Sequence, residues 1–251
     1  MLKKFVPMLK VKQSHLVIGL GEVGKAICAV LQDNPKNIVV GLDKGDVDNR
    51  QYDVIHICFP YSRKFKRQIR QYCQHYLKIR GLVIIHSTVP VGTTESLDQI
   101  DAVHSPVRGV HPHLYEGIKT FVKFFGGHRA LEASKIFIKC GVKTAFSSEA
   151  RDTEMLKLLD TTYYGWNIIF NKWAMWKCRK HGADFNFVYT LGNETYNKGY
   201  AKLGRKDVVR PVLNYIPGKI GGHCVIPNCK LLGGWVSLII IYLNRILGKM
   251  K

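Results

Sequence analysis

The chain has 251 residues, of which 46% are hydrophobic and 22% charged, so its composition excludes an intrinsically disordered protein. Its 38 basic and 18 acidic residues give a formal net charge of +20, which favours anionic ligands or surfaces. Nucleic acid, anionic lipid and a phosphorylated small molecule all fit that charge. The length allows a full hydrophobic core and a second small domain.

The cysteines predict a reducing compartment. There are seven, an odd number, and they are scattered without a Cys-x-x-Cys pair, so we expect no disulfide framework. Residues 1–10 lack the long apolar core of a secretory signal, and we therefore expect a cytoplasmic protein. Residues 231–243 are apolar but fall short of the ~20 residues that a membrane span needs, which predicts a docking helix and no membrane span.

A glycine-rich turn follows the first apolar run of the chain. Residues 15–18 predict a strand, and Gly19, Gly21 and Gly24 then form a Gly-x-Gly-x-x-Gly pattern before a predicted helix. Such glycines allow a tight turn, close approach of a pyrophosphate, and packing of the helix against the strand. The residues expected to bind a dinucleotide here are Gly19, Leu20, Gly21, Glu22, Val23 and Gly24.

A second short apolar run, residues 37–42, ends at Asp43. This acid lies about 20 residues past the fingerprint, where a ribose-binding carboxylate is expected. The pattern predicts NAD as cofactor. Lys44 beside the acid leaves NADP open, because a carboxylate repels the 2′-phosphate.

Two further buried strands are predicted over residues 52–60 and 81–88, with a helix over 62–79 between them. This helix has one apolar face and one basic face; we interpret the basic face as solvated, so nucleic acid is a possible but not a favoured partner. Ligands of open α/β sheets bind at the carboxyl ends of strands. At those ends stand Pro60, Ser87 and Thr88.

The pattern continues with a possible short strand and a polar loop over residues 101–114, a strand over 120–127, a helix over 129–139 and a final strand over 142–146. Alternating strands and helices with short connections predict an α/β, Rossmann-like, doubly wound and mostly parallel sheet. We assign it to a cofactor-binding domain over residues 1–148.

A second, helical domain is predicted over residues 149–251. Residues 149–181 contain no proline and end in a basic cluster before a glycine, which predicts one helix about 50 Å long. One of its faces carries Glu154, Lys157 and Thr161, whereas aromatic residues dominate the others. Such a helix needs a partner, and we expect a homodimer through it.

The loop over residues 216–229 carries the cysteine with the best case for reactivity. His223, Lys219 and nearby glycine amides favour a thiolate at Cys224, although a merely retained loop cysteine is the alternative. We expect no metal site at the histidines around position 111, because no carboxylate or thiol cluster has matching spacing.

Several motifs occur together in a fixed order: the glycine fingerprint, Asp43, Ser-Thr-Val-Pro-Val-Gly-Thr-Thr over 87–94, Glu-Met-Leu-Lys over 154–157, and Gly-Gly-His-Cys within 218–228. On these motifs, residues 14–232 resemble the nucleotide-sugar 6-dehydrogenases, such as those acting on UDP-glucose and UDP-N-acetylmannosamine. The resemblance implies oxidation of a sugar alcohol to a carboxylate by two NAD, through a thiohemiacetal and a thioester on a cysteine.

The resemblance also assigns roles to residues. It makes Cys224 the nucleophile, Lys157 the stabiliser of oxyanion charge, and Thr88 the residue that places water and substrate; Glu116 matches a loop glutamate after a one-residue gap. Thr161 and Asn228 stand where the family has an asparagine and an aspartate, so they are candidate site residues that depart from its pattern.

The sequence stops about where the family's UDP-binding domain begins. We therefore expect a substrate other than an intact UDP-sugar, a second chain that completes the site, or an impaired reaction. Two alternative functions stay open. One is a two-electron hydroxyacid or alcohol dehydrogenase with Lys157 as acid and base. The other is an NAD-binding or nucleic-acid-associated protein without turnover.

Overall fold

The computed structural model describes residues 12–97, 99–109, 111–222 and 224–249. The segment 1–10, on which the expectation of no secretory signal depends, lies outside these residues. The chain forms two compact units, Met1–Lys157 and Leu158–Lys251. The domain boundary predicted at residue 148 stays a prediction.

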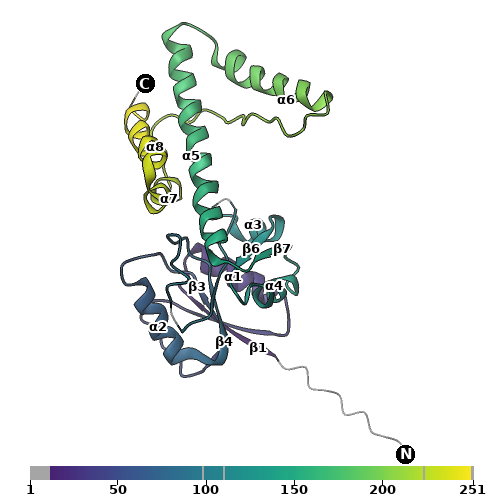
Figure 1. Ribbon diagram of the computed structural model, residues 1–251, viewed down its shortest axis with the longest axis vertical. Helices are drawn as coiled ribbons and strands as arrows, with labels where there is room; N and C mark the ends of the chain where they lie inside the picture. The colour runs from purple at the N-terminus through teal and green to yellow at the C-terminus, as the bar shows by residue number, and fades with distance from the viewer. Residues whose placement is uncertain (1–11, 98, 110, 223, 250–251) are drawn as a thin grey trace, which may run out of the picture. The chain divides into compact units, whose positions relative to one another are not determined.

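The first unit is built on a seven-stranded sheet in the order β2-β1-β3-β4-β5-β6-β7 (Figure 1). Neighbouring strands are parallel except β5 and β6, which are antiparallel. The predicted α/β fold with a mostly parallel sheet is therefore confirmed. The strands are β1 (Gln13–Ile18), β2 (Asn37–Leu42), β3 (Tyr52–Ile57), β4 (Leu77–Ile85), β5 (Ala102–His104), β6 (Lys123–Gly126) and β7 (Thr144–Ser147).

Helices cover both faces of this sheet. On one face α1, α3 and α4 contribute to a buried apolar cluster, and on the other face α2 contributes to a second. In the sheet β2 lies on one side of β1 and β3 lies on the other side. The strand order therefore reverses at β1, which makes the carboxyl ends of β1 and β3 a topological switch point. The helices are α1 (Glu22–Gln32), α2 (Phe65–Tyr76), α3 (Leu114–Thr120) and α4 (Ala130–Ile138).

Two predictions about this unit are wrong in detail. The helix predicted over 62–79 ends at Tyr76, because the chain turns into β4 at Leu77, which pairs with Tyr52 ahead of a register shift. The polar loop predicted before residue 114 is followed by α3, which the sequence prediction missed. A helix of only seven residues gives little periodicity, although Leu114 and Ile118 are buried one turn apart and α3 packs on α1.

The second unit is helical. The predicted long helix is present as α5 (Ala150–Lys180), whose residues belong to both units. The helix predicted at 231–243 is wrong at its start, because residues 231–232 end α7 and α8 begins only after Gly233, at Gly234. At the other end α8 continues past residue 243 through Asn244, whose buried side chain accepts a hydrogen bond from the backbone N–H of Ile220 at 2.7 Å. Among the described residues, no helix is both long and apolar enough to cross a bilayer. The remaining helices are η1 (Asn186–Leu191), α6 (Gly192–Lys202), α7 (Val225–Leu232) and α8 (Gly234–Leu247).

Candidate cofactor and active site

The three glycines of the fingerprint have different surroundings. A Cβ on Gly19, whose φ is +93°, would lie 2.9 Å from the backbone N of Phe59, and a Cβ on Gly24 would lie 1.9 Å from the carbonyl oxygen of Gly19. Both glycines are therefore required for packing the turn against its neighbours. A Cβ on Gly21 would meet nothing within 4 Å, so this glycine faces open space.

The amino end of α1 is available to an anion. Gly21 caps the helix without a side-chain hydrogen bond, which leaves the first-turn amides for another acceptor. The Glu22 carboxylate in this first turn is hydrogen-bonded to the His111 ring, so the segment before α3 is held to the start of α1. Open space at Gly21 together with uncapped amides fits the pyrophosphate of a dinucleotide.

Other predicted cofactor residues follow neighbouring strands at the same edge of the sheet. Asp43 follows β2, whose last residue is in register with the last residue of β1, and its Oδ1 accepts a hydrogen bond from the backbone N–H of Lys44 at 2.9 Å. Ser87 follows β4 and donates from Oγ to the carbonyl oxygen of Phe59 at 2.6 Å, which places it beside the segment that leads to Pro60. The half-buried Thr88 comes next. The structure therefore brings these residues to one edge.

Two residues of α5 hold loops of the first unit. The Glu154 carboxylate is fully buried and accepts hydrogen bonds from the backbone N–H groups of Gly92 and Thr94 at 2.6 and 2.8 Å, and from the Thr94 hydroxyl at 2.7 Å. It anchors the loop after β4. Lys157 lies nearly one turn later, is half-buried, and donates from Nζ to the carbonyl oxygen of Val107 at 2.9 Å.

The two departures from the family pattern contact each other in the second unit. Asn228, which is 5% exposed, donates from Nδ2 to the Thr161 hydroxyl at 3.0 Å. The pair is polar but carries no charge. Cys224 is half-buried and occupies the N-cap position of α7, four residues before Asn228; His223 lies outside the described residues.

The predicted catalytic residues thus belong to two units. Lys157, Thr88 and Glu116 are in the first, where Glu116 is exposed in the first turn of α3. Cys224 and the Asn228 pair are in the second. Within the described ranges no three His, Cys, Asp or Glu side chains gather as a metal site.

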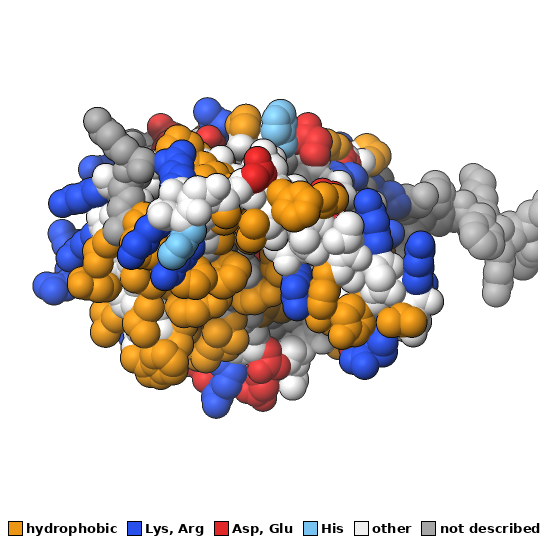
Figure 2. Space-filling view, turned by 90° about the horizontal axis from the view of Figure 1, so that it is seen from above, with side chains coloured by type: hydrophobic (Ala, Val, Ile, Leu, Met, Phe, Trp, Pro, Cys, Tyr) orange, Lys and Arg blue, Asp and Glu red, His pale blue; other side chains and the backbone are white. Residues whose placement is uncertain are grey.

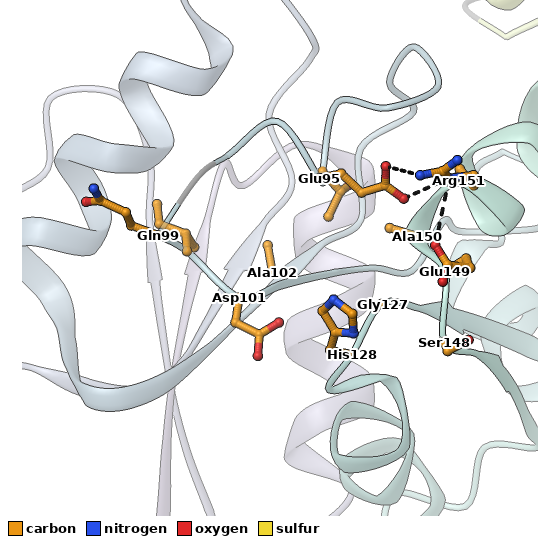
Figure 3. A pocket seen from close by; sticks show the side chains of 12 residues that line it. Glu95, Gln99, Asp101, Ala102, Gly127, His128, Ser148, Glu149, Ala150 and Arg151 are labelled. Atoms are coloured by element: carbon orange, nitrogen blue, oxygen red, sulfur yellow. Dashed lines mark hydrogen bonds and ion pairs between the residues drawn. The ribbon is translucent and has the colours of Figure 1, made fainter.

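A hollow with charged side chains at the start of α5 lies away from the glycine loop. It encloses about 510 Å³ beside the amino end of β5, and Figure 3 shows Glu95 paired with Arg151, which also faces Glu149. The glycine loop instead follows the carboxyl end of β1. Because β1, β3, β4 and β5 are parallel, this hollow lies at the opposite edge of the sheet.

Sequence reasoning missed a group of buried histidines and one buried lysine. Burial lowers the pKa of His15 to about 4, that of His104 to about 3 and that of Lys123 to about 7, and it holds the pKa values of His56 and His86 well below the usual range. The available signal was their position inside or directly beside apolar strand runs, where alternation turns them toward the core.

The fold, a Rossmann-like sheet followed by helices, is shared with solved structures of several dehydrogenases. The sequence itself matches no protein-family model and no curated protein. The structure of a UDP-D-ManNAc dehydrogenase from Pyrococcus horikoshii is similar with a TM-score of 0.77 at 18% identity, over 93% of this chain and 68% of that one. A UDP-glucose dehydrogenase from Pyrobaculum islandicum gives a TM-score of 0.72 at 17% identity, over 96% and 70%.

A shorter enzyme is also similar. The 3-hydroxyisobutyrate dehydrogenase of Mycobacterium tuberculosis gives a TM-score of 0.68 at 15% identity, and the likeness covers 93% of each chain. This chain therefore spans about two thirds of the UDP-sugar dehydrogenases and nearly all of the hydroxyacid dehydrogenase.

Proposed function

We propose that this protein is an NAD-dependent oxidoreductase of the nucleotide-sugar dehydrogenase type, which oxidises a sugar alcohol to a carboxylate. The observation that carries the proposal is the glycine loop: Gly19 and Gly24 are fixed by packing, whereas Gly21 faces open space at an uncapped helix end. The ordered motifs and the likeness in fold support the same reading. The positive net charge, +20, suits a diphosphate substrate.

In the proposed mechanism the first-turn amides of α1 hold the pyrophosphate and Asp43 holds the ribose hydroxyls. NAD, when bound, supplies the hydride acceptor. Cys224 attacks the aldehyde that the first oxidation forms, and the resulting thiohemiacetal loses a second hydride to become a thioester, which water hydrolyses. The Lys157 ammonium stabilises the negative charge that develops on oxygen, and Thr88 positions substrate and water.

The cysteine is tested by counting reduced cofactor against product. Purified protein is incubated with NAD and a panel of UDP- and GDP-sugars, and NADH and carboxylate product are both measured. We expect two NADH per acid. The Cys224→Ser variant should lose acid formation, whereas the control Cys73→Ser, a half-buried cysteine on α2, should keep it. Full four-electron turnover by Cys224→Ser would show that the covalent step is wrong.

A two-electron hydroxyacid dehydrogenase is the second candidate. Its support is the match of 93% of this chain to 93% of a 3-hydroxyisobutyrate dehydrogenase, together with the uncharged pair of Asn228 and Thr161 where the sugar dehydrogenases are expected to have an aspartate and an asparagine. In this reading Lys157 is the acid and base and Cys224 has no role. One NADH per substrate, unchanged in Cys224→Ser, would favour it.

We also propose a homodimer through α5, in the cytoplasm. Exposed apolar side chains follow this helix. Seen from above, hydrophobic side chains gather on one part of the surface, with lysines and arginines nearby (Figure 2). Free cysteines fit a reducing compartment. A single species of monomer mass in sedimentation at micromolar concentration would contradict the dimer. The exposed side chains of α5 include Leu159, Tyr163, Trp166, Phe170 and Trp173.

A further inference from the structure

Three histidines and a lysine form one hydrogen-bonded chain inside the first unit. His15 Nδ1 lies 3.1 Å from His56 Nε2, and His56 Nδ1 lies 3.0 Å from His86 Nε2. His86 Nδ1 is 2.9 Å from the carbonyl oxygen of Ser105 and 3.3 Å from Lys123 Nζ, which itself donates to Ser105 at 3.0 Å. All four residues are buried, and none is more than 4% exposed.

This hydrogen-bonded chain of side chains crosses the sheet toward the edge that carries the glycine loop. His15 is in β1, His56 is in the neighbouring β3, and His86 follows the carboxyl end of β4. Ser105 follows the carboxyl end of β5, and Lys123 begins the antiparallel β6 beside it. The inner end of the chain therefore lies at the same edge as the predicted cofactor residues.

His15, at the other end of this hydrogen-bonded chain, lies next to a polar cavity. Asn37 and Asp53 both raise the pKa of His15 against the larger, opposing effect of burial, so both lie close to this ring. The same two residues line an open cavity of about 630 Å³. His15 Nε2 is buried and has no hydrogen-bond partner among the described residues, so a proton reaches it only when a water molecule enters from the side of this cavity.

The geometry restricts the positions of the protons. A carbonyl oxygen only accepts, so while Lys123 is neutral His86 carries its proton on Nδ1 and donates to Ser105. Its Nε2 then accepts from His56 Nδ1, whose ring accepts from His15 Nδ1 in turn. When Lys123 is an ammonium it donates to His86 Nδ1, and the two hydrogen bonds between the imidazoles reverse. The bond from His86 to the Ser105 carbonyl oxygen is then lost, and Lys123 remains the donor to that oxygen.

We propose that this chain is a proton relay, in which Lys123 gains or loses one proton at the inner end while the three imidazoles reverse tautomer together. In the uptake direction, His15 Nε2 accepts a proton from water, and the Nδ1 protons of His15, His56 and His86 each move to the next nitrogen, the last reaching Lys123 Nζ. One proton enters and none is lost. The rings are neutral in both end states, and no electrons are transferred.

The surroundings of Lys123 allow it to change charge near neutral pH. Burial lowers its pKa to about 7, and smaller effects of Cys58 and Lys157 act in opposite directions, the thiol raising it and the ammonium lowering it. The rings of Phe125 and Phe137 lie 5.6 and 5.2 Å from Nζ and favour the charged form. The ammonium in turn lowers the pKa values of the histidines around it, which keeps those rings neutral: His56, His86 and His104.

His104 offers an internal control. It is buried near the relay but bonded elsewhere: its Nε2 lies 3.2 Å from the carbonyl oxygen of Ser87 and its Nδ1 lies 2.8 Å from the Thr153 hydroxyl. The Ser87 carbonyl oxygen only accepts, so it holds the proton on Nε2; the Thr153 hydroxyl, which also lies 2.9 Å from the carbonyl oxygen of Ala150, then donates to Nδ1. The tautomer of His104 should therefore not change when Lys123 titrates.

The test is nitrogen NMR of the imidazoles, which needs no substrate and so stands apart from the proposed oxidation. Protein labelled with ¹⁵N-histidine is titrated from about pH 5.5 to about pH 8.5, a range that spans neutrality. We expect His15, His56 and His86 to change from Nε2–H to Nδ1–H with one shared midpoint, while His104 keeps Nε2–H. Fixed tautomers, or three separate midpoints, in the unmodified protein would overturn the relay.

A variant tests the role of the lysine. In Lys123→Met we expect the three rings to stay in the Nδ1–H form across the whole range, because His86 can then donate only to Ser105. Tautomers that still reverse with pH in this variant would show that Lys123 does not control the chain. The titration of the unmodified protein decides the proposal if this variant fails to fold.

Discussion

Gly24 and Gly21 of the fingerprint should respond differently to replacement by alanine: the first replacement should lower stability, and the second should lower the affinity for NAD. A Cβ on Gly24 would lie 1.9 Å from the carbonyl oxygen of Gly19, so the helix must move away from the strand. Overpacking of this kind costs about 1–3 kcal/mol, which corresponds to a fall of roughly 2–12 °C in Tm for a chain of this size. Gly21 has a φ of −66° and a ψ of −169°, which alanine adopts freely. The free energy of unfolding of Gly21→Ala should therefore lie within about 1 kcal/mol of that of the parent protein.

The same pair should separate folding from cofactor binding. A methyl group at residue 21 fills the open space where the pyrophosphate approaches and removes at least one hydrogen bond to a charged group, worth about 1.5–3 kcal/mol. The Kd for NAD should then rise about 10- to 150-fold. Calorimetric titration with NAD and thermal unfolding followed by circular dichroism measure the two effects. Unchanged NAD affinity in a folded Gly21→Ala protein would refute the assignment of this loop.

Three further predictions concern buried polar groups. Asn228→Ala should cost about 0.5–1.5 kcal/mol by removing the hydrogen bond to the Thr161 hydroxyl oxygen, which still donates to the Leu158 carbonyl, and adding Thr161→Val should cost less than it does alone in urea unfolding; additive losses would contradict the pairing. Glu154→Gln should destabilise by at least about 1.5 kcal/mol, because an amide replaces one oxygen that accepts backbone N–H groups; wild-type stability would contradict this anchor. Since the pKa of His15 falls from 6.5 to about 4 on folding, the unfolded state binds more protons in this window. The free energy of unfolding should therefore drop by about 3 kcal/mol from this residue on acidification from pH 6.5 to 4, and a flat pH profile would contradict it.

The parts of the fold that follow local rules were predictable from the sequence. The glycine spacing, the acid after the second strand and the alternation of strands and helices each depend on neighbours in sequence, and they led to the sheet. The proline-free stretch with its basic end before a glycine led in the same way to the long helix α5. Short elements gave weaker signals. The seven residues of α3 carry too few turns to show a helical period, and an early strand start at Leu77 depends on pairing with Tyr52 in β3.

The contacts that the sequence could not supply are those between distant residues. Glu154 appeared only as a neighbour of Lys157 on one helix face, whereas the structure gives its carboxylate three donors from the loop after β4. Asn228 and Thr161 appeared as two separate departures, yet they form one hydrogen bond across 67 positions. Pairing of this kind depends on tertiary packing, which no local pattern encodes.

The most direct test of the central claim is NADH formation by the purified protein. NAD is supplied with nucleotide sugars and, separately, with small hydroxyacids, and NADH is followed spectroscopically with the Gly21→Ala variant as control. The account predicts NADH that depends on both the protein and an alcohol substrate and that falls sharply in the variant. A protein that binds NAD but forms no NADH with any of these alcohols would contradict it.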